Sequence, residues 1–396
     1  MQLPEALAAL YARIPLGMRL GLGPMQAACA RTDHPERAVR VVHVAGTNGK
    51  GSVCAMVESI ARAARMRTGL YTSPHLCRFA ERIRIGGEPV SDLMLADLLA
   101  RSLDAGPDLS FFETATLAAF LAFRDARVDL AVVEVGLGGR LDATNVVPCP
   151  AAAAITRIAL DHTDRLGNTL VEIGREKAGI AKQGLDLLVG PMAPEVRAAI
   201  DEVARACGAT TSDVDGELAL PSVGLVGIHQ RKNARIAAML GERIGATPAA
   251  IDEGIRNVQW AGRLERIGDV LLDGAHNVDG AEALVAHVRT LGLPPDRVAL
   301  VFGALADKDW GPMLDVLAPI AGRRIYVPAS GASRAAADPR AMAERHAGTV
   351  APSVEEALEA AASWDSSLTV VCGSLLTVGQ ARARLLGLPR DPPVAL

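Results

Sequence analysis

Residues 43–52 read His-Val-Ala-Gly-Thr-Asn-Gly-Lys-Gly-Ser and follow the short apolar run Val39–Val44. Glycines let a turn wrap its backbone N–H groups around an anion, and a helix that follows adds the dipole of its N-terminus. In such a turn Lys50 can reach the β- and γ-phosphates of a nucleotide, and Ser52 can hold Mg²⁺. The stretch therefore predicts a phosphate-binding loop between a strand and a helix.

The spacing of this loop differs from that of the usual P-loop. Val44 stands where the usual pattern has its first glycine, and Gly51 separates Lys50 from Ser52. A glycine-rich turn that binds no nucleotide is the alternative. The coincidence of lysine, serine and a preceding strand favours phosphate binding.

Length and charge limit what the chain can be. Its 396 residues exceed one average core, so two domains are expected. Hydrophobic residues make up 50% and aromatic residues only 3%, which predicts cores built from aliphatic side chains. A net charge of −4 without a basic cluster gives no reason to expect nucleic acid as a partner.

The sequence gives no sign of a targeting or membrane segment. Its first residues lack the basic region followed by an apolar stretch that marks a signal peptide. No apolar run reaches the length of a membrane span, so no membrane partner is expected. Six scattered cysteines without a CxxC pair fit reduced thiols and argue against structural zinc. We therefore expect a cytoplasmic protein, and nothing in the sequence requires more than a monomer.

Short β-rich runs alternate with longer helical stretches such as Val53–Arg65 and Thr114–Arg127. This alternation predicts βαβ units and a mainly parallel sheet that binds ligands at the carboxyl ends of its strands. The strands expected in the first part of the chain are Val39–Val44, Leu130–Val135, Ala153–Ile158 and Leu185–Val189.

A second series of strands begins after Arg256–Arg266. Its expected members are Val270–Leu272, Val298–Phe302, Arg324–Val327 and Thr369–Val371. We therefore expect an α/β protein with a P-loop ATPase-type, mainly parallel domain over residues 1–262 and a smaller Rossmann-like α/β domain over residues 263–396. Residues 209–224 are polar and then punctuated by glycine and proline, which predicts a surface excursion.

An acid stands at the end of the expected strand Leu130–Val135. At the tip of a buried strand beside a phosphate loop, Glu134 is placed to ligate Mg²⁺ directly or through water. The glycines that follow suggest a dinucleotide fingerprint, but its third glycine position holds Leu141 and no helix is expected to open there. A dehydrogenase is therefore disfavoured.

Two polar or aromatic segments have both a binding and a structural interpretation. Arg140 and Asp142, on the loop after Glu134, can contact a substrate or form a solvated pair that caps the loop. In Ser110-Phe111-Phe112-Glu113, at a helix entry, the aromatics can flank a flat ring and Glu113 can sit at the helix start. Core packing explains the two phenylalanines equally well.

Three single residues are candidates for metal or phosphate chemistry. Ser73 precedes a proline, so its extended geometry leaves the hydroxyl free for a Mg²⁺ contact, although an ordinary turn is the alternative. His162, just beyond the strand Ala153–Ile158, is a competent metal ligand when neutral. Lys177 either neutralises charge as an ammonium or, with a lowered pKa, adds CO₂ and becomes a carbamate, and the residues leave both open.

Three later segments can complete a nucleotide pocket. They are Gly227–Asn233, Gly262–Glu265 and Asp273–Asn277. An asparagine amide matches the edge of adenine, an arginine meets phosphates, and an aspartate accepts hydrogen bonds from ribose hydroxyls.

Taken together, these segments resemble the dihydrofolate synthase/folylpolyglutamate synthase family, which is related to the Mur ligases. The resemblance runs from about Leu20 to Gly373. Its most specific pieces are HVAGTNGKGS, YTSPHL, EVGLGGRLDATN, the DH…LG…T…EKAGI series and DGAHN. The additional glycine at position 51 is the family's own form of the phosphate loop.

The resemblance implies a set of site residues. Those for ATP are Asn48, Gly49, Lys50, Gly51, Ser52, Asn233, Arg263, Asp273 and His276. Those for Mg²⁺ are Ser52, Ser73, Glu134 and His162. Catalytic roles fall to Lys50, His162 and Lys177, of which Lys177 matches the family's carbamylated lysine. Those for the pteroate substrate are Leu20, Gly21, Leu22, Ser110, Phe111, Phe112, Glu113, Leu141, Asp142 and Ala143.

The resemblance also implies a reaction. It is ATP-dependent amide ligation through an acyl phosphate, which joins L-glutamate to dihydropteroate and adds further glutamates to folates. The LDATN form around Asp142 resembles bifunctional bacterial members.

Other functions explain fewer of these features. A Mur ligase acting on a UDP-linked precursor usually has an additional N-terminal domain, for which a loop starting at residue 46 leaves no room. A P-loop kinase or GTPase does not account for a C-terminal domain with DGAHN. A catalytically silent nucleotide-binding protein is disfavoured because Lys50, Glu134, His162 and Lys177 are all present.

Overall fold

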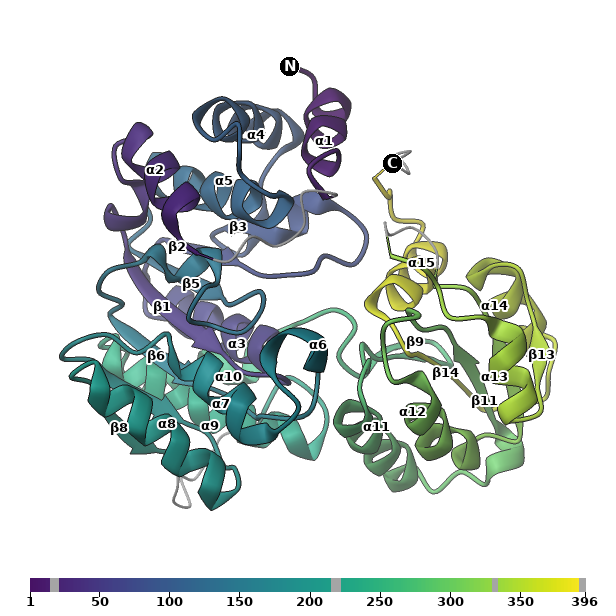
Figure 1. The fold of residues 1–396 in the computed structure, drawn as a ribbon. Helices are drawn as coiled ribbons and strands as arrows, with labels where there is room; N and C mark the ends of the chain where they lie inside the picture. The colour runs from purple at the N-terminus through teal and green to yellow at the C-terminus, as the bar shows by residue number, and fades with distance from the viewer. Residues whose placement is uncertain (15–20, 215–221, 330–333, 392–396) are drawn as a thin grey trace.

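Two sheets of mainly parallel strands, each flanked by helices, make up the chain (Figure 1). The computed structural model describes residues 1–14, 21–214, 222–329 and 334–391. The strands of the first sheet lie in the order β4-β3-β2-β5-β1-β6-β7-β8, and those of the second in the order β13-β12-β11-β14-β10-β9. The predicted α/β class, with a larger N-terminal and a smaller C-terminal sheet, is confirmed.

The first sheet and its helices come from the chain up to Asn257. The strands are β1 (Arg40–Ala45), β2 (Thr68–Tyr71), β3 (Ile83–Ile85), β4 (Glu88–Pro89), β5 (Leu130–Glu134), β6 (Ala152–Ile155), β7 (Asp186–Val189) and β8 (Thr210–Asp213). The helices are α1 (Leu3–Tyr11), α2 (Gly23–Arg31), α3 (Lys50–Ala63), α4 (Asp92–Ala105), α5 (Phe111–Asp125), α6 (Thr163–Leu166), α7 (Leu170–Ala178), α8 (Pro194–Ala206), α9 (Ile228–Arg243) and α10 (Pro248–Asn257).

The second sheet and its helices follow from Glu265 onward. The strands are β9 (Glu265–Ile267), β10 (Val270–Leu272), β11 (Val298–Phe302), β12 (Arg323–Tyr326), β13 (Thr349–Val350) and β14 (Leu368–Cys372). The helices are α11 (Val278–Thr290), α12 (Trp310–Leu317), α13 (Pro339–Arg345), α14 (Val354–Ala362) and α15 (Leu375–Leu386). In the part of the chain that the structure describes, no helix has the length and apolar character needed to cross a membrane.

Strand β1 is central to the first sheet and pairs in parallel with β5 and β6. Its side chains alternate between the two faces, as a pleated strand requires. Val42 and Val44 pack with α3, α9 and α10, whereas Val41 and Ala45 pack with the helices of the opposite face. Val44 is paired with Glu134, so the acid at the end of β5 lies beside the chain that leads into the phosphate loop.

The predicted strands agree with the structure except at their ends and in one edge strand. Val270–Leu272 and Val298–Phe302 are confirmed, while β6 ends at Ile155 instead of Ile158. The surface excursion predicted for residues 209–224 is wrong at its start, because Thr210–Asp213 forms β8 and pairs with β7. This edge strand is polar because one of its sides faces solvent, which removed the apolar signal. The later residues 215–221 lie outside the described ranges.

Helices α3 and α10 approach so closely that a side chain at Gly254 has no room. A Cβ there would lie 2.4 Å from Ile60 Cα and 2.5 Å from Ile60 N. Intrinsic helix propensity favours alanine over glycine by about 1 kcal/mol, but backbone atoms cannot move aside as a flexible side chain can. We expect Gly254→Ala to lower the free energy of unfolding by about 1–3 kcal/mol.

Urea denaturation followed by circular dichroism measures this effect. Gly23→Ala is the matched control, because a Cβ at the first residue of α2 meets nothing within 4 Å. Equal unfolding midpoints for the two variants would contradict the close contact of α3 with α10.

Candidate active site

The predicted phosphate loop joins β1 to α3 and lines a cavity of about 1390 Å³. Gly46 and Gly49 have φ angles of 147° and 92°, which favour glycine. A Cβ on Gly46 would lie 1.8 Å from Thr156 Oγ1, and one on Gly49 would lie 2.5 Å from Asn233 Oδ1. Backbone angle and close neighbours therefore both require glycine at these positions.

Hydrogen bonds to the chain beyond β6 hold the first part of the loop. The N–H groups of Thr47 and Asn48 donate to the Arg157 carbonyl at 2.8 and 3.3 Å. The hydroxyl of Thr156 donates to the Asn48 carbonyl at 2.8 Å. These N–H groups are thus engaged within the protein.

The second part of the loop presents the N-terminus of α3 to the cavity. The Val53 N–H donates to the Gly49 carbonyl at 2.9 Å and so closes the first helical turn. The N–H groups of Lys50, Gly51 and Ser52 precede that bond, and all three residues line the cavity. Such N-terminal donors, together with the helix dipole, suit an anion.

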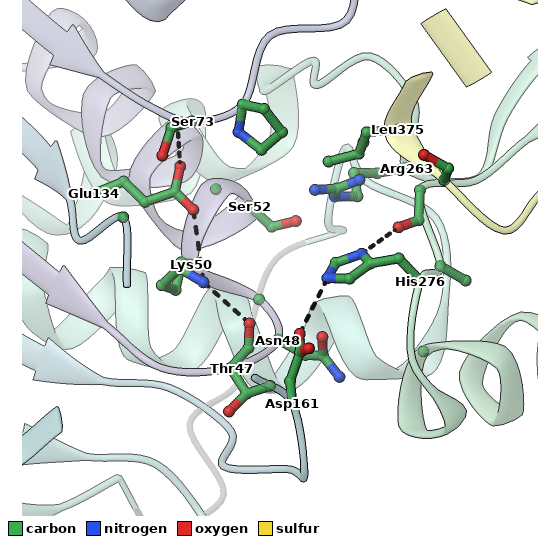
Figure 2. Close-up of a pocket in the computed structure, with 18 of the residues that line it drawn as sticks. Thr47, Asn48, Lys50, Ser52, Ser73, Glu134, Asp161, Arg263, His276 and Leu375 are labelled. Carbon is green, nitrogen blue, oxygen red and sulfur yellow. Dashed lines mark hydrogen bonds and ion pairs between the residues drawn. The ribbon is translucent and has the colours of Figure 1, made fainter. Parts of the chain in front are cut away.

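Lys50 and Glu134 face each other across the loop (Figure 2). Lys50 Nζ donates to the Thr47 carbonyl at 3.1 Å and lies 4.0 Å from Glu134 Oε1. The Ser73 N–H donates to Glu134 Oε2 at 3.0 Å. Burial raises the pKa of Glu134, and the charge of Lys50 opposes that rise. The acid and the lysine predicted from separate motifs are thus brought together.

The additional glycine of the loop lies beneath an indole ring that the sequence reasoning missed. A Cβ on Gly51 would lie 3.2 Å from Trp260 Nε1 and 3.7 Å from Glu134 Oε2. The guanidinium of Arg84 stacks on Trp260 at 5.1 Å from the ring centroid. Glycine at position 51 therefore lets the indole approach the start of α3.

Side chains of α9 contact the end of the loop. Gln230 Nε2 donates to Ser52 Oγ at 3.2 Å, and Asn233 Nδ2 donates to Gln230 Oε1 at 3.0 Å. Asn233 was predicted as a nucleotide contact, whereas Gln230 was not singled out. Both residues line the cavity.

Lys177 reaches the loop from α7 and is 4% exposed. Its ammonium donates to the Gly46 carbonyl at 2.9 Å. Burial and then the charge of Lys50 lower the pKa of Lys177 to about 7. A substantial fraction of this amine is therefore uncharged at neutral pH.

Asp161 contacts a lysine and a histidine from the second sheet's half of the chain. Lys308 Nζ donates to Asp161 Oδ1 at 2.5 Å. His276 Nε2 lies 3.5 Å from Asp161 Oδ2, as Figure 2 shows. Burial would raise the pKa of Asp161, but its contacts with His276, His162 and Lys308 outweigh burial and lower it. His162 lies 3.3 Å from Lys308, and burial lowers its pKa to about 4, which keeps the imidazole neutral. Lys308 was missed, although it is one of only five lysines in the chain.

Asp273 organises the turn that carries Arg263. Its carboxylate accepts hydrogen bonds from the N–H groups of Leu264 and Ala275 at 2.9 and 3.0 Å. Burial raises the pKa of Asp273, and the Arg263 charge opposes the rise. Arg263 lines the same cavity as the phosphate loop, so the second domain contributes a guanidinium to the site.

Asn48 connects the phosphate loop directly to α11. Its Nδ2 donates to Asn277 Oδ1 at 3.0 Å and to Asp279 Oδ2 at 2.7 Å. Asn277 Nδ2 donates back to Asn48 Oδ1 at 3.0 Å, and Arg157 pairs with Asp279. We call these four side chains the interdomain clasp. Asp279 and Arg157 were not predicted, and nothing in their local pattern marked them.

Aromatic rings form another wall of the cavity. The ring centroid of Phe111 lies 5.3 Å from that of Tyr11 and 5.9 Å from that of Phe79. The guanidinium of the buried Arg82 stacks on Phe111 and Phe79 and donates to His75 Nδ1 at 2.9 Å. This wall presents flat apolar surface beside a positive charge.

Most residues predicted to contact pteroate do not line the cavity. Phe111 lines it, whereas Ser110 and Glu113 form the capping box of α5. Phe112 lies behind Gly136, where a Cβ would come within 2.3 Å of the ring. Gly21 and Leu22 directly precede α2, and Leu20 lies outside the described residues.

The loop with Leu141, Asp142 and Ala143 is also packed inward. Asp142 is buried and accepts from the Leu137 N–H at 2.9 Å. The solvated Arg140–Asp142 pair, one of two alternatives, is not formed because Arg140 pairs with Glu176 at 2.9 Å.

The predicted Mg²⁺ residues all line the cavity. They are Ser52, Ser73, Glu134 and His162. Within the described ranges, no group of three or more His, Cys, Asp or Glu side chains is arranged to hold a metal ion. Two members of the predicted set are hydroxyls, so this set stays a prediction.

A phosphate loop facing a buried acid, with an arginine supplied by a second α/β domain, is the arrangement of a nucleotide-using enzyme, and two domain families identify the class as an ATP-dependent ligase of the Mur type. Residues 44–189 match the Mur ligase middle domain, and residues 262–375 match the Mur ligase glutamate ligase domain. The chain belongs to the dihydrofolate synthase/folylpolyglutamate synthase family.

Relatives cover nearly the whole chain. The dihydrofolate synthase/folylpolyglutamate synthase of Escherichia coli is 36% identical over 91% of this chain and 90% of the relative. The dihydrofolate synthase/folylpolyglutamate synthase of Bacillus subtilis is 35% identical over 79% of this chain and 82% of the relative. The structure of E. coli FolC in complex with DHPP and ADP has a TM-score of 0.87 at 33% identity, covering 96% of this chain and 97% of that one.

Removing the shared acceptor of the clasp is expected to loosen the contact between the domains. Asp279→Ala removes one partner each of Asn48 and Arg157, and Arg157 is 56% exposed. We therefore expect a loss of stability of only about 1 kcal/mol but a larger radius of gyration in small-angle X-ray scattering. Glu282→Ala, exposed on the same helix, is the control. Identical scattering from the two variants would contradict a clasp role for Asp279.

Proposed function

We propose that this chain joins L-glutamate to dihydropteroate and adds further glutamates to folates, using ATP and Mg²⁺. The observation that carries the proposal is the single cavity in which the phosphate loop, Lys50 and Glu134 face Arg263 of the second domain. The names of the relatives support this choice of substrates, since the relatives include dihydrofolate synthases and folylpolyglutamate synthases.

ATP and a divalent cation fit the side chains present. The related bifunctional folylpolyglutamate synthase/dihydrofolate synthase from Yersinia pestis has been solved in complex with AMPPNP and Mn ion. That structure has a TM-score of 0.87 at 32% identity, covering 97% of this chain and 98% of that one. Lys50 Nζ lies 4.0 Å from the buried carboxylate of Glu134. The oxygens of Glu134 and the hydroxyls of Ser52 and Ser73 are oxygen ligands of the kind that Mg²⁺ prefers. Neutral His162 would add a ring nitrogen. Bound Mg²⁺ would neutralise charge at the phosphates.

Amide ligation by this route requires two displacements. A substrate carboxylate oxygen attacks the γ-phosphorus of ATP and ADP leaves, which gives an acyl phosphate. The glutamate amine then attacks the acyl carbon, phosphate leaves and the nitrogen loses a proton. Lys50 and Arg263 stabilise the charge that spreads over the transferring group, and the N–H groups of Lys50–Ser52 orient it.

Domain closure protects the acyl phosphate from water. Asp161, His276 and Lys308 meet across the cavity and, with the interdomain clasp, hold the second domain against the first. Excluding water favours transfer to the amine over hydrolysis. Asn233, Asp273 and His276 are assigned to the nucleotide within this closed site, as are Asn48 and Gly49.

The pteroate ring system is assigned to the side of the cavity with Phe111. The stacked Arg82 and the neighbouring rings offer a flat apolar surface for it.

Several broader properties belong to the same proposal. The domains are assigned to residues 1–262 and 263–396, since β9 begins at Glu265 and the last helix of the first half ends at Asn257. The protein is assigned to the cytoplasm and acts as a monomer.

A coupled assay of ADP release tests the proposed function. We expect turnover with ATP, Mg²⁺, dihydropteroate and L-glutamate together, and none when either acceptor is left out. Lys50→Ala removes a charge from the transferring group and should lower kcat by about 10²- to 10³-fold.

Arg231→Ala is the control for this assay, because Arg231 is exposed on α9. Turnover with a UDP-muramyl peptide precursor, or phosphorylation of an alcohol, would overturn the assignment.

Lys177 is proposed to act as a carbamate, formed when its neutral amine adds CO₂ and releases a proton. Its pKa of about 7 leaves enough neutral amine at physiological pH. After removal of CO₂ we expect activity to fall and bicarbonate to restore it, with restoration increasing as pH rises through about 7. Activity should be restored better at higher pH because only the deprotonated amine of Lys177 can add CO₂.

Two variants separate the carbamate from a plain cation. Lys177→Ala should be inactive and partly rescued by formate or acetate, which replace the carboxylate group. Lys177→Arg keeps the charge but cannot add CO₂, so an active Lys177→Arg enzyme would disprove the carbamate role.

A further inference from the structure

His43, the first residue of the phosphate-loop motif, is a buried titratable group that the proposed mechanism does not use. It lies on β1 and is 0% exposed. Its Nε2 lies 2.8 Å from the Oγ1 of Thr144, which is also 0% exposed. Thr144 belongs to the loop after β5, so this contact joins the strand of the phosphate loop to a different segment.

The directions of the hydrogen bonds follow from the donors available. Thr144 Oγ1 donates its one proton to Asp142 Oδ1 at 2.5 Å, so it can only accept from His43. His43 therefore carries its proton on Nε2. Burial lowers the pKa of His43 to about 3, which keeps the ring neutral and this donor in place.

Asp142 connects the His43–Thr144 pair to the wall of the cavity through hydrogen bonds. Its Oδ1 also accepts from the Thr144 N–H at 3.0 Å, and its Oδ2 accepts from the Leu137 N–H at 2.9 Å. Gly136, Leu137 and Gly138 line the cavity, whereas Asp142 and Thr144 do not. The carboxylate thus holds the main chain that faces the ligand space.

Packing supports the Gly136 end of this wall. A Cβ on Gly136 would lie 2.3 Å from the Phe112 ring, so the ring supports the wall from behind. Gly138 has a φ of 66° and no side chain to anchor it. The hydrogen bond from Leu137 to Asp142 is therefore a main determinant of where the wall lies.

We propose that His43 and Thr144 are positioning residues that act through Asp142 to fix Gly136–Gly138 as the wall against which the pteroate ring system packs. The assignment of the ring system rests on the proposed function, whereas the hydrogen-bonded chain itself does not. These hydrogen bonds also explain why Asp142 is buried although, among the described residues, no cationic side chain lies within ion-pair distance of it.

Thr144→Val tests the proposal with little change in shape. It removes the proton donor to Asp142 and the acceptor for His43. We expect KM for dihydropteroate to rise about ten-fold, as the loss of one buried hydrogen bond allows, while KM for ATP changes less than two-fold. Thr144→Ser keeps the hydroxyl and should restore the wild-type KM.

Thr68→Val is a matched control. The Thr68 hydroxyl is also buried and donates to a buried carboxylate, Glu58 Oε1, at 2.6 Å, but neither residue lines the cavity. Thr68→Val should lower the melting temperature without raising KM for dihydropteroate. An equal rise of KM in both variants, or none in Thr144→Val, would overturn the proposal.

A double variant tests whether His43 acts through Thr144. If it does, adding His43→Leu to Thr144→Val changes KM for dihydropteroate no further, since the shared hydroxyl is already gone. Additive effects would disprove the linkage.

Hydrogen exchange separates this inference from the proposed function. In Thr144→Val the amides of residues 136–138 should exchange faster than in the wild type, with or without substrate. Unchanged exchange refutes the positioning role. A wild-type enzyme inactive on dihydropteroate refutes the proposed function instead.

Discussion

The close packing of the phosphate loop is the constraint on which the rest of the site depends. Side chains from the segment just after β6 and from α9 occupy the space that a Cβ on Gly46 or Gly49 would need. Because the loop cannot relax into that space, its first N–H groups bind Arg157 and its later ones face the cavity. The same fixed backbone presents Asn48 to α11, so the arrangement of the two domains follows from the loop.

Much of the fold could be predicted because buried parallel strands leave apolar runs in the sequence. β1, β5, β10 and β11 are such strands, and Glu134 was placed at a strand tip for this reason. The polar edge strand β8 gave no such signal. Strand pairing then brought Glu134 and the phosphate loop together, as expected from parallel order.

The remaining site residues depend on contacts between distant segments. Trp260 lies over Gly51, and Asp279 binds Asn48, yet neither pair is close in sequence. Asp142 was identified as a site residue from its motif, but the motif did not reveal that its oxygens bind its own loop. Local patterns reveal residue chemistry, whereas the direction of a side chain depends on what packs around it.

The indole above Gly51 gives the protein an intrinsic optical probe. The chain has three tryptophans, and the other two, Trp310 and Trp364, lie in the second half of the fold. Trp260 alone lies next to the phosphate loop, with its ring nitrogen 3.2 Å from the Cβ position of Gly51. With Trp310 and Trp364 replaced by phenylalanine, the emission of a single fluorophore would report the occupancy of the loop in real time, without a label.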